Sequence, residues 1–240
     1  MLRPNLRVAI ALTTILLDIE GTTTPIEFVH TTLFGYARAR VQEFLERHEA
    51  EPEVEADIAL LRAEYAAEQP PPNPPMASVS AYVHWLIDRD RKSTGLKSLQ
   101  GKIWAEGYRT GDLRGEVYPD VPPALARWRE QGKEIAIFSS GSIQAQRDLF
   151  ASTAEGDLTR FIRAYFDTTT GPKTVVQSYT RIATALERTP ADVLFLSDVE
   201  AELDAARAAG MQTALCVRTP ESAQPAAGHT VVHTFDQLPG

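Results

Sequence analysis

The chain has little of what disulfide-bonded, zinc-binding or membrane proteins need. Its single cysteine, Cys216, excludes an internal disulfide and lies in an apolar run, where desolvation disfavours thiolate formation. That setting predicts a buried strand residue rather than a nucleophile. The five histidines show no metal-ligand spacing among themselves. No apolar run approaches the length needed to span a membrane, so we expect a soluble cytoplasmic protein without a membrane partner.

Positive charge is also scarce. Lysine and arginine number 24 against 32 acidic residues, the net charge is −8, and no stretch forms a basic stripe. Binding to nucleic acid through phosphate neutralisation is therefore not expected. Hydrophobic residues make up 43% of the 240, which is ample for a packed interior. An acidic protein that handles an anionic substrate must place positive charge locally, through a metal, a lysine or helix N-termini.

Short apolar runs that end in polar residues alternate with helical patterns through much of the chain. Runs this short and rich in Ile, Val, Leu and Phe are typical of buried strands in a parallel sheet. Gly132 and Gly210 stand where helix C-caps belong. The alternation predicts an α/β fold with a doubly wound parallel sheet. The predicted strands are 12–17, 134–138, 164–166, 193–196 and 212–217, and the helices between them are 122–131, 142–152, 175–188 and 200–209.

One stretch breaks this rhythm. Residues 25–115 contain no strand-like run, which predicts a core made of residues 1–24 and 116–240 and a helical cap, 25–115, inserted after the first strand. In open α/β sheets ligands bind at the carboxyl edge of the strands, so this position favours a lid over the substrate. A peripheral helical bundle is the alternative. The helices predicted in the insertion are 27–48, 54–69, 78–91 and 99–109.

An acidic pair follows the first predicted strand, in the segment Asp18-Ile19-Glu20-Gly21-Thr22-Thr23. Alternation along a strand end puts Asp18 and Glu20 on the same side, where two carboxylates repel each other. A hard divalent ion such as Mg²⁺, with phosphate oxygens completing its shell, would remove that conflict. Gly21 permits a sharp turn, and the hydroxyl and amide of Thr22 can bind phosphate. Taken alone, a loop with a capping aspartate explains the motif equally well.

The second and third site segments each offer a group suited to phosphate. Ser139, Ser140 and Gly141 precede a helix, where a small hydroxyl and free amides form an anion site, although an ordinary N-cap serine is the simpler explanation. Lys173 follows a turn and opens the next helix. It could neutralise phosphate or pair with an aspartate, whereas most lysines at such positions are solvated.

The fourth segment, Ser197 to Asp204, carries four acidic residues over a strand end and a helix start. Favourable interaction with the helix dipole explains such a cluster without any site. Asp198 is nearest the strand end and is the residue that could reach a metal. The order of the four signals is more informative than any one of them: an acid pair, a hydroxyl, a lysine and an acid, each after its own strand.

This arrangement resembles the haloacid-dehalogenase superfamily of phosphotransferases across essentially the whole chain. With Glu20 at the second acidic position, where most superfamily phosphatases carry aspartate, the first motif is similar to the enolase-phosphatase family of methionine salvage. The resemblance extends to the segments 118–121, 138–142, 171–173 and 195–206.

The resemblance implies a phosphatase that works through an aspartyl-phosphate. Its substrate would be the small molecule 2,3-diketo-5-methylthiopentyl-1-phosphate, which is enolised and dephosphorylated to an acireductone, and the protein would be a monomer. Glu20 would either ligate the metal or exchange a proton with the leaving group and water. The implied roles are nucleophile for Asp18, Mg²⁺ ligation by Asp18, Glu20 and Asp198, phosphate binding by Thr22, Ser139, Ser140 and Gly141, and charge compensation by Lys173.

Two alternatives stay open at this point. A superfamily phosphatase that acts on another small phosphate ester would need the same motifs, because these define phosphoryl chemistry better than they define the leaving group. A non-catalytic phosphate- or metal-binding module would need only Glu20, Asp198 and the serines, and it gives no reason for Asp18 and Lys173 to occur together. A dehalogenase is less favoured, since that reaction needs no metal.

Overall fold

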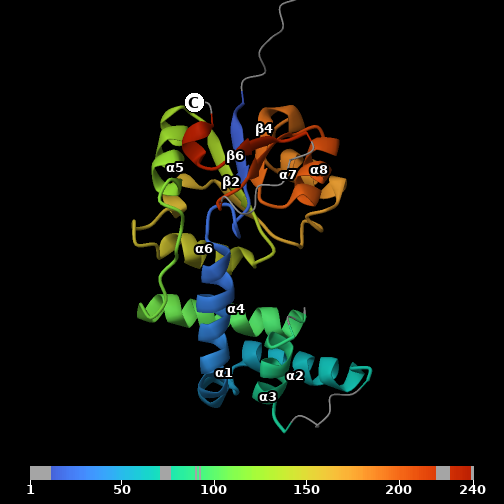
Figure 1. Cartoon of the computed structure of the whole chain (residues 1–240). Helices are drawn as coiled ribbons and strands as arrows, with labels where there is room; N and C mark the ends of the chain where they lie inside the picture. Colours follow the sequence, from blue (N-terminus) through green and yellow to red (C-terminus); the bar gives the residue numbers. More distant parts are fainter. Residues whose placement is uncertain (1–11, 71–76, 90, 92, 220–227, 239–240) are drawn as a thin grey trace, which may run out of the picture. The chain divides into compact units, whose positions relative to one another are not determined.

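The computed structural model describes residues 12–70, 77–89, 91, 93–219 and 228–238. The chain divides into two compact units (Figure 1). The sheet unit comprises Met1–Pro25, Val117–Ile143 and Glu155–Gly240, and the helical unit comprises Ile26–Glu116 and Gln144–Ala154. The second segment of the helical unit falls within the part of the chain that sequence analysis assigned to the core.

The sheet unit contains a six-stranded sheet in which every pairing is parallel, with the strand order β3-β2-β1-β4-β5-β6. This architecture confirms the predicted α/β fold class. The edge strand β6 was not predicted, because it has only three residues, two of which are exposed. The strands are β1 (Thr14–Leu17), β2 (Glu134–Phe138), β3 (Ala164–Phe166), β4 (Val193–Ser197), β5 (Gln212–Cys216) and β6 (Thr230–Val232).

Helices cover both faces of the sheet. Figure 1 shows α5 (Val121–Glu130) on one side and α7 (Val176–Ala185) with α8 (Glu200–Ala208) on the other. Alternate strand residues, such as Phe138 and Phe195, pack against α7 and α8, and their neighbours along the strands are buried on the opposite face. Both faces are thus apolar, as a doubly wound sheet requires. Short 3₁₀ turns lie at Thr159–Phe161 (η2), Pro190–Asp192 (η3) and Phe235–Gln237 (η5).

The cysteine and the two capping glycines lie where the sequence predicts them. Cys216 is buried in β5, and burial raises the pKa of its thiol to about 12, so the prediction of an inert strand residue is confirmed. Gly132 and Gly210 follow the ends of α5 and α8 with φ values of 76° and 94°. These left-handed conformations favour glycine and end the helices.

The helical unit is built around one apolar cluster. Helix α4 packs against α1 and α2, and α3 packs against the same two helices. Helix α4 begins five residues before the predicted start, because Ser93 caps it by accepting a hydrogen bond from the Leu96 amide (3.0 Å). The helices of this unit are the π-helix η1 (Phe28–Leu33), α1 (Phe34–His48), α2 (Pro52–Ala67), α3 (Val79–Ile87), α4 (Thr94–Thr110) and α6 (Ile143–Ala151).

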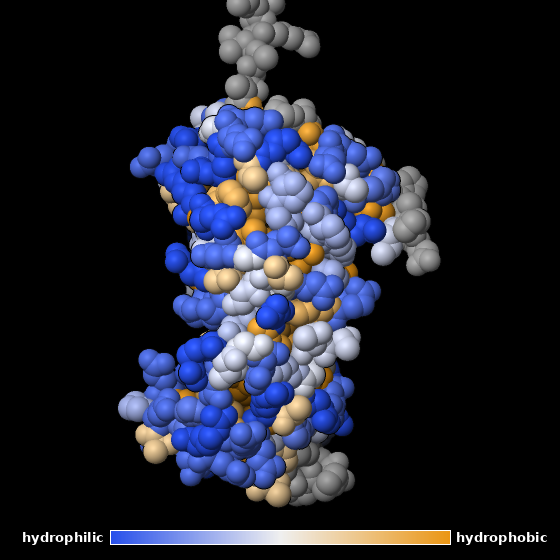
Figure 2. Space-filling view, turned by 90° about the vertical axis from the view of Figure 1, so that its left-hand side faces the viewer, coloured by the Kyte–Doolittle hydropathy of each residue, from blue (hydrophilic) through white to orange (hydrophobic). Residues whose placement is uncertain are grey.

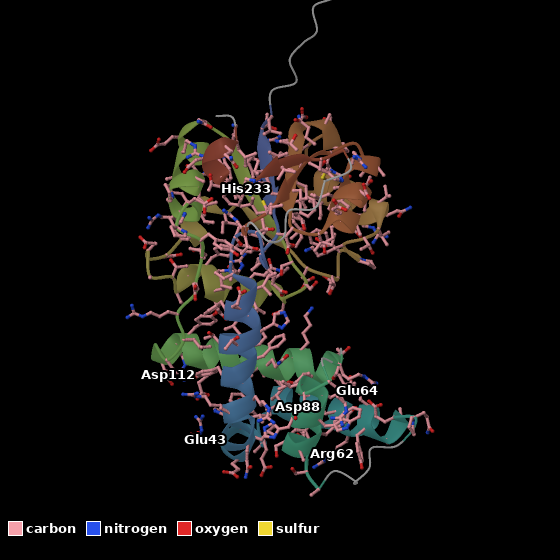
Figure 3. All side chains as sticks on the ribbon, viewed as in Figure 1. Glu43, Arg62, Glu64, Asp88, Asp112 and His233 are labelled. Carbon is pink, nitrogen blue, oxygen red and sulfur yellow. The ribbon has the colours of Figure 1, made fainter. Side chains whose placement is uncertain are left out.

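Charged side chains cover the outside of the helical unit. Figure 3 labels Asp88 and Asp112 there, and Asp88 Oδ1 pairs with Arg38 Nε at 3.0 Å. The face shown in Figure 2 is mostly hydrophilic, with hydrophobic residues in small, separated areas. In the described ranges, no helix is both long enough and apolar enough to cross a membrane.

One carboxylate of the helical unit lies in an unfavourable environment. Asp148 Oδ1 accepts a hydrogen bond from Gln144 Nε2 (2.7 Å), whereas Oδ2 is buried with no partner among the described residues. Burial raises the pKa of Asp148 above its usual value, and Gln144 offsets this only in part. The folded state therefore binds this proton more tightly than the unfolded state, so stability falls as pH rises above the unfolded pKa of about 4.

We expect Asp148→Asn to raise the Tm at about pH 7.5, and the gain to shrink as the pH is lowered toward about 4.5. Thermal melts of the variant and the wild type at several pH values measure the gain in Tm and its dependence on pH. Asp157→Asn is the matched control, because hydrogen bonds from the Thr159 hydroxyl and amide lower the pKa of Asp157. That substitution should lower the Tm at neutral pH. A gain for Asp148→Asn that grows at low pH would contradict the argument.

Candidate active site

The predicted site segments meet at the carboxyl edge of three adjacent strands. In the register of the sheet, Leu17 of β1 lies opposite Ile137 of β2 on one side and Leu196 of β4 on the other. Asp18, Ser139 and Asp198 therefore emerge side by side, one or two residues beyond these pairs. The chain continues from β1 to β2 and β3 on one side and then crosses to β4 on the other side of β1, and open α/β sheets bind their ligands where the strand order reverses in this way.

The loop after β1 is a tight turn centred on one carbonyl. The amides of Thr22, Thr23 and Thr24 all donate to Ile19 O, at 3.2, 2.9 and 2.9 Å. The turn already uses the Thr22 amide, and phosphate binding by Thr22 stays a prediction. The Thr22 side chain is fully buried, and its hydroxyl has no partner among the described residues. The Thr23 hydroxyl donates to Asp18 O (3.1 Å), so the turn also supports the backbone of Asp18.

Asp18 lies at the centre of a buried network. Its Oδ1 accepts from the Ile19 amide (2.7 Å) and pairs with Lys173 Nζ (2.6 Å), and its Oδ2 accepts from Ser197 Oγ (3.1 Å). Lys173 Nζ also pairs with Glu202 Oε2 at 2.7 Å. Ser197 Oγ lies 3.0 Å from the same Glu202 oxygen, so the four side chains form a closed ring.

The ring shifts the pKa values of its members. Burial lowers the pKa of Lys173, but the adjacent Asp18 and Glu202 carboxylates outweigh burial and raise it above its usual value. Burial and the charge of Asp18 raise the pKa of Glu202, and Lys173 and Ser197 offset this only in part. Lys173 is 8% exposed, which excludes the alternative of a solvated lysine at a helix start.

Backbone contacts explain why Lys173 turns inward. The Tyr179 hydroxyl donates to Lys173 O (2.6 Å), and the Ser178 hydroxyl donates to Pro172 O (2.7 Å), which ties this turn to α7. Tyr179 is itself fully buried between Phe138 and Phe195, with ring centroids 5.6 and 5.1 Å away. The sheet core thus determines where the lysine side chain begins.

Asp198 faces the loop that carries Asp18. Gly21 has a φ of 67°, and a Cβ built on it would lie 2.2 Å from Asp198 Oδ2, so only glycine leaves room for this carboxylate. Burial and then the charge of Asp18 raise the pKa of Asp198 to about 7. When all are ionised, Asp18, Asp198, Glu202 and Lys173 leave two negative charges uncompensated. Such a site favours a cation.

The segment after β2 is compact. The Ser139 amide donates to Phe166 O (3.2 Å), and Ser139 Oγ accepts from the Gly141 amide (3.2 Å). Ser139 is 4% exposed, whereas Ser140 is exposed. The hydroxyl of Ser139 therefore organises the turn ahead of α6, and the hydroxyl of Ser140 is accessible.

Metal ligands were predicted at Asp18, Glu20 and Asp198. Among the described residues, no group of three His, Cys, Asp or Glu side chains is arranged to hold a metal ion, and the three-residue ligand set stays a prediction. Both oxygens of Asp18 already accept hydrogen bonds. The donor chemistry nevertheless fits Mg²⁺, which proteins usually bind through one or two carboxylates together with substrate phosphate. Asp18 and Asp198 supply that pair next to the narrow space above Gly21.

Sequence reasoning missed two members of the network. Ser197 was named only as the residue before Asp198, and Glu202 was attributed to the helix dipole. Glu202 lies one helical turn after Asp198, so their spacing was the available signal that both face the site. The dipole explanation still suits Glu200, which is exposed, and Asp204 pairs with Arg207.

Comparisons with known proteins agree with this geometry. A family model described as haloacid dehalogenase-like hydrolase matches residues 12–210. Enolase-phosphatase E1 of Synechococcus elongatus is 52% identical over 95% of this chain and 98% of its own length. Enolase-phosphatase E1 of Sorangium cellulosum is 49% identical over 93% and 96%. The crystal structure of the UTR4 protein from Saccharomyces cerevisiae has a TM-score of 0.76 at 33% identity and covers 95% of this chain and 100% of its own. The chain belongs to the haloacid dehalogenase-like hydrolases and, within them, to the enolase-phosphatase E1 family.

Proposed function

We propose that this chain is a Mg²⁺-dependent enolase-phosphatase that converts 2,3-diketo-5-methylthiopentyl-1-phosphate to an acireductone and phosphate. The observation that carries the proposal is the buried ring in which Lys173 Nζ contacts both Asp18 (2.6 Å) and Glu202 (2.7 Å). Similarity to enolase-phosphatases over more than nine-tenths of the chain supports the choice of substrate.

Phosphoryl transfer begins with Asp18. A carboxylate oxygen of Asp18 attacks phosphorus, the bond from phosphorus to the substrate oxygen breaks, and an aspartyl-phosphate forms. Water then attacks phosphorus, which releases phosphate and regenerates the carboxylate. Lys173 holds its ammonium against the attacking carboxylate and compensates the charge that phosphate brings. Ser139 and Ser140 bind phosphate oxygens through the turn after β2.

Asp18 and Asp198 would hold Mg²⁺, with Glu20 as a further ligand or as the group that exchanges a proton with the leaving oxygen. When bound, Mg²⁺ would supply positive charge beside the transferring phosphoryl group and, in the enolisation step, beside the diketone oxygens. Proton exchange by Glu20 would suit the exit of the enol oxygen, which needs a proton as the bond to phosphorus breaks.

Removal of Mg²⁺ is expected to lower turnover of para-nitrophenyl phosphate by at least about 100-fold. The reason is that, without the cation, the negative charges of Asp18 and Asp198 are uncompensated where the phosphate must bind. Activity is measured after exhaustive chelation and after Mg²⁺ is restored. Calorimetric titration with Mg²⁺ gives a second readout, in which Asp198→Asn should weaken binding. Undiminished activity in chelator would exclude the metal site.

The substrate is tested with purified full-length protein and the diketo phosphate under argon. Phosphate release and the ultraviolet absorbance of the acireductone are followed together, with para-nitrophenyl phosphate as the reference ester. The proposal predicts that both products appear at equal rates and that kcat/KM is far higher for the diketo phosphate. A higher kcat/KM for the reference ester, or phosphate release without the acireductone, would favour a phosphatase of another small ester.

We also propose that residues 25–115 act as a cap that contacts the substrate. Their insertion directly after the loop of Asp18 supports this role. Hydrogen exchange of the whole protein, with and without a phosphonate analogue of the substrate, tests it. Protection within the helical unit is expected in addition to protection of residues 18–24 and 139–141. Protection confined to the sheet unit would contradict the proposal.

The proposal further includes a cytoplasmic location and a monomeric state. The single, buried cysteine suits a reducing compartment. Sedimentation equilibrium at micromolar concentration tests the monomer, and the mass of a dimer would contradict it.

A further inference from the structure

Arg218 follows β5 and is almost fully buried, although no part of the proposed chemistry uses it. Its side chain is 5% exposed and lies between two aromatic rings, 4.5 Å from the centroid of Tyr118 and 4.4 Å from that of Phe235. It pairs with Asp120, whose Oδ2 lies 2.7 Å from Arg218 Nη1. The segment 118–121 is one of the sequence motifs to which no role has been assigned so far.

Two nitrogens of the Arg218 guanidinium donate to the same carbonyl oxygen in the loop that carries Asp18. Nε and Nη2 of Arg218 both donate to Thr22 O, at 2.9 and 2.6 Å. Nη1 donates to Asp120 and to the carbonyl of His233, a residue labelled in Figure 3, at 2.7 and 3.2 Å. A planar fork can satisfy these directions at once, whereas the single nitrogen of a lysine cannot.

Two short paths connect this contact to Asp18. Next to Thr22, the Thr23 hydroxyl donates to Asp18 O at 3.1 Å. Thr23 O accepts from the Tyr118 amide (2.9 Å), so Tyr118 both stacks on Arg218 and holds the same turn. The other path runs through Gly21, which leaves Asp198 so little room that a Cβ would lie 2.2 Å from it. A shift of the turn would therefore change the spacing between Asp18 and Asp198.

We propose that Arg218 is a positioning residue for the nucleophile: together with Tyr118 and Asp120 it holds Thr22 O and so sets the position of Asp18. The inference rests on the proposed function, because it assigns Asp18 the role of nucleophile. Arg218 contacts Thr22 O and so acts on the turn that carries Asp18.

A different explanation is that Arg218 merely docks the C-terminal segment on the sheet. Asp120 Oδ2 also accepts from the Phe235 amide (2.6 Å), so the cluster does reach that segment. Arg127 provides the matched control. Its polar contacts are with that segment rather than with the loop of Asp18: it donates to Phe235 O (2.9 Å) and pairs with Asp236 (3.1 Å).

The test compares Arg218→Lys with Arg127→Lys in the full-length protein, with para-nitrophenyl phosphate and saturating Mg²⁺. For Arg218→Lys we expect kcat to fall by about 10- to 100-fold, since small misplacements of reacting groups have effects of this size. KM and the inhibition constant for inorganic phosphate should change by less than about threefold, because the phosphate-binding groups stay in place. Arg127→Lys should leave kcat within about twofold of wild type at a similar loss of Tm.

Each outcome has a definite meaning. Equal losses of kcat in the two variants, or a normal kcat in Arg218→Lys, would overturn the positioning role. If Arg218→Lys does not fold, Asp120→Asn replaces it: an asparagine oxygen still accepts from Phe235 but weakens the hold on Arg218, so kcat should fall while phosphate inhibition is unchanged. A wild-type kcat in that variant would equally overturn the role. If wild-type protein shows no Mg²⁺-dependent turnover, or Asp18→Asn retains it, the proposed function fails instead, independently of Arg218.

Discussion

Replacement of Asp18 by asparagine is expected to reduce kcat by at least about 10⁴-fold, because an amide keeps the shape of the side chain but cannot attack phosphorus. The protein should remain folded. Loss of the Asp18 charge leaves Lys173 paired with Glu202 at 2.7 Å, so the buried ammonium stays compensated. The substitution also removes the charge of Asp18, which adds to the effect of burial in raising the pKa of Asp198 and Glu202. We therefore expect the variant to be at least as stable as the wild type.

The loss of kcat is measured by turnover of para-nitrophenyl phosphate and of the diketo phosphate. The stability of the variant is measured by thermal unfolding. Inhibition by inorganic phosphate, determined from residual activity or by calorimetry, reports whether the phosphate site is intact. A loss of only a few-fold in kcat would be incompatible with a nucleophilic role for Asp18.

The second large effect is expected for Lys173→Met. Without the ammonium, Asp18 and Glu202 face each other in a buried site, and phosphate adds further negative charge. We expect kcat to fall by at least about 10³-fold, which corresponds to several kcal/mol of transition-state stabilisation. Stability should also fall, by about 3–5 kcal/mol at neutral pH, as is usual when one partner of a buried ion pair is removed.

The pH dependence of that stability loss is a further signature. In the variant, Glu202 loses the ammonium that partly offsets burial and the charge of Asp18, so its folded-state pKa rises further above the unfolded value. Stability is then lost as pH rises above the unfolded pKa of about 4 and is regained as pH falls. Urea titrations at several pH values measure the free energy of unfolding of the variant and of the wild type. The difference between the two free energies should become smaller toward low pH.

Lys102→Met is the matched control. Lys102 Nζ pairs with Asp57 Oδ2 at 2.6 Å in the helical unit, and the carboxylate is largely buried. Loss of the Lys102 ammonium should reduce stability while kcat on para-nitrophenyl phosphate stays near the wild-type value. If Lys173→Met turns over substrate like the wild type at saturation, Lys173 has no part in the chemistry.

Local pattern was enough to predict most of the sheet. Strand β2 and β3 have the predicted bounds, and β1, β4 and β5 differ by one or two residues. Strands β1, β2 and β4 are buried on both faces almost throughout, so their apolar runs are continuous and distinct from their surroundings. Both edge strands have three residues, but two of those in β6 are exposed and none of those in β3 is, so only β3 was predicted.

The sequence predicted which strand ends form the site, but it did not predict the contacts between the side chains of the site. The pairing of Lys173 with Glu202 joins a turn before α7 to the first turn of α8, and Arg218 reaches from β5 to the loop after β1. Such contacts depend on strand order, which the sequence does not display. Thr22 is a further example: the sequence suggested a phosphate ligand, and it did not show that the turn buries this side chain and uses its amide.

The most direct test of the mechanism is chemical identification of the phosphorylated residue. Wild-type protein is mixed with the diketo phosphate and Mg²⁺, quenched in acid during the first turnover, reduced with borohydride and digested for mass spectrometry. An acyl phosphate on Asp18 is converted by reduction to homoserine, so homoserine at position 18 is predicted, and it should be absent when substrate is omitted. Phosphate recovered on another residue, or complete turnover with no modification at position 18, would contradict the assignment of Asp18 as the nucleophile.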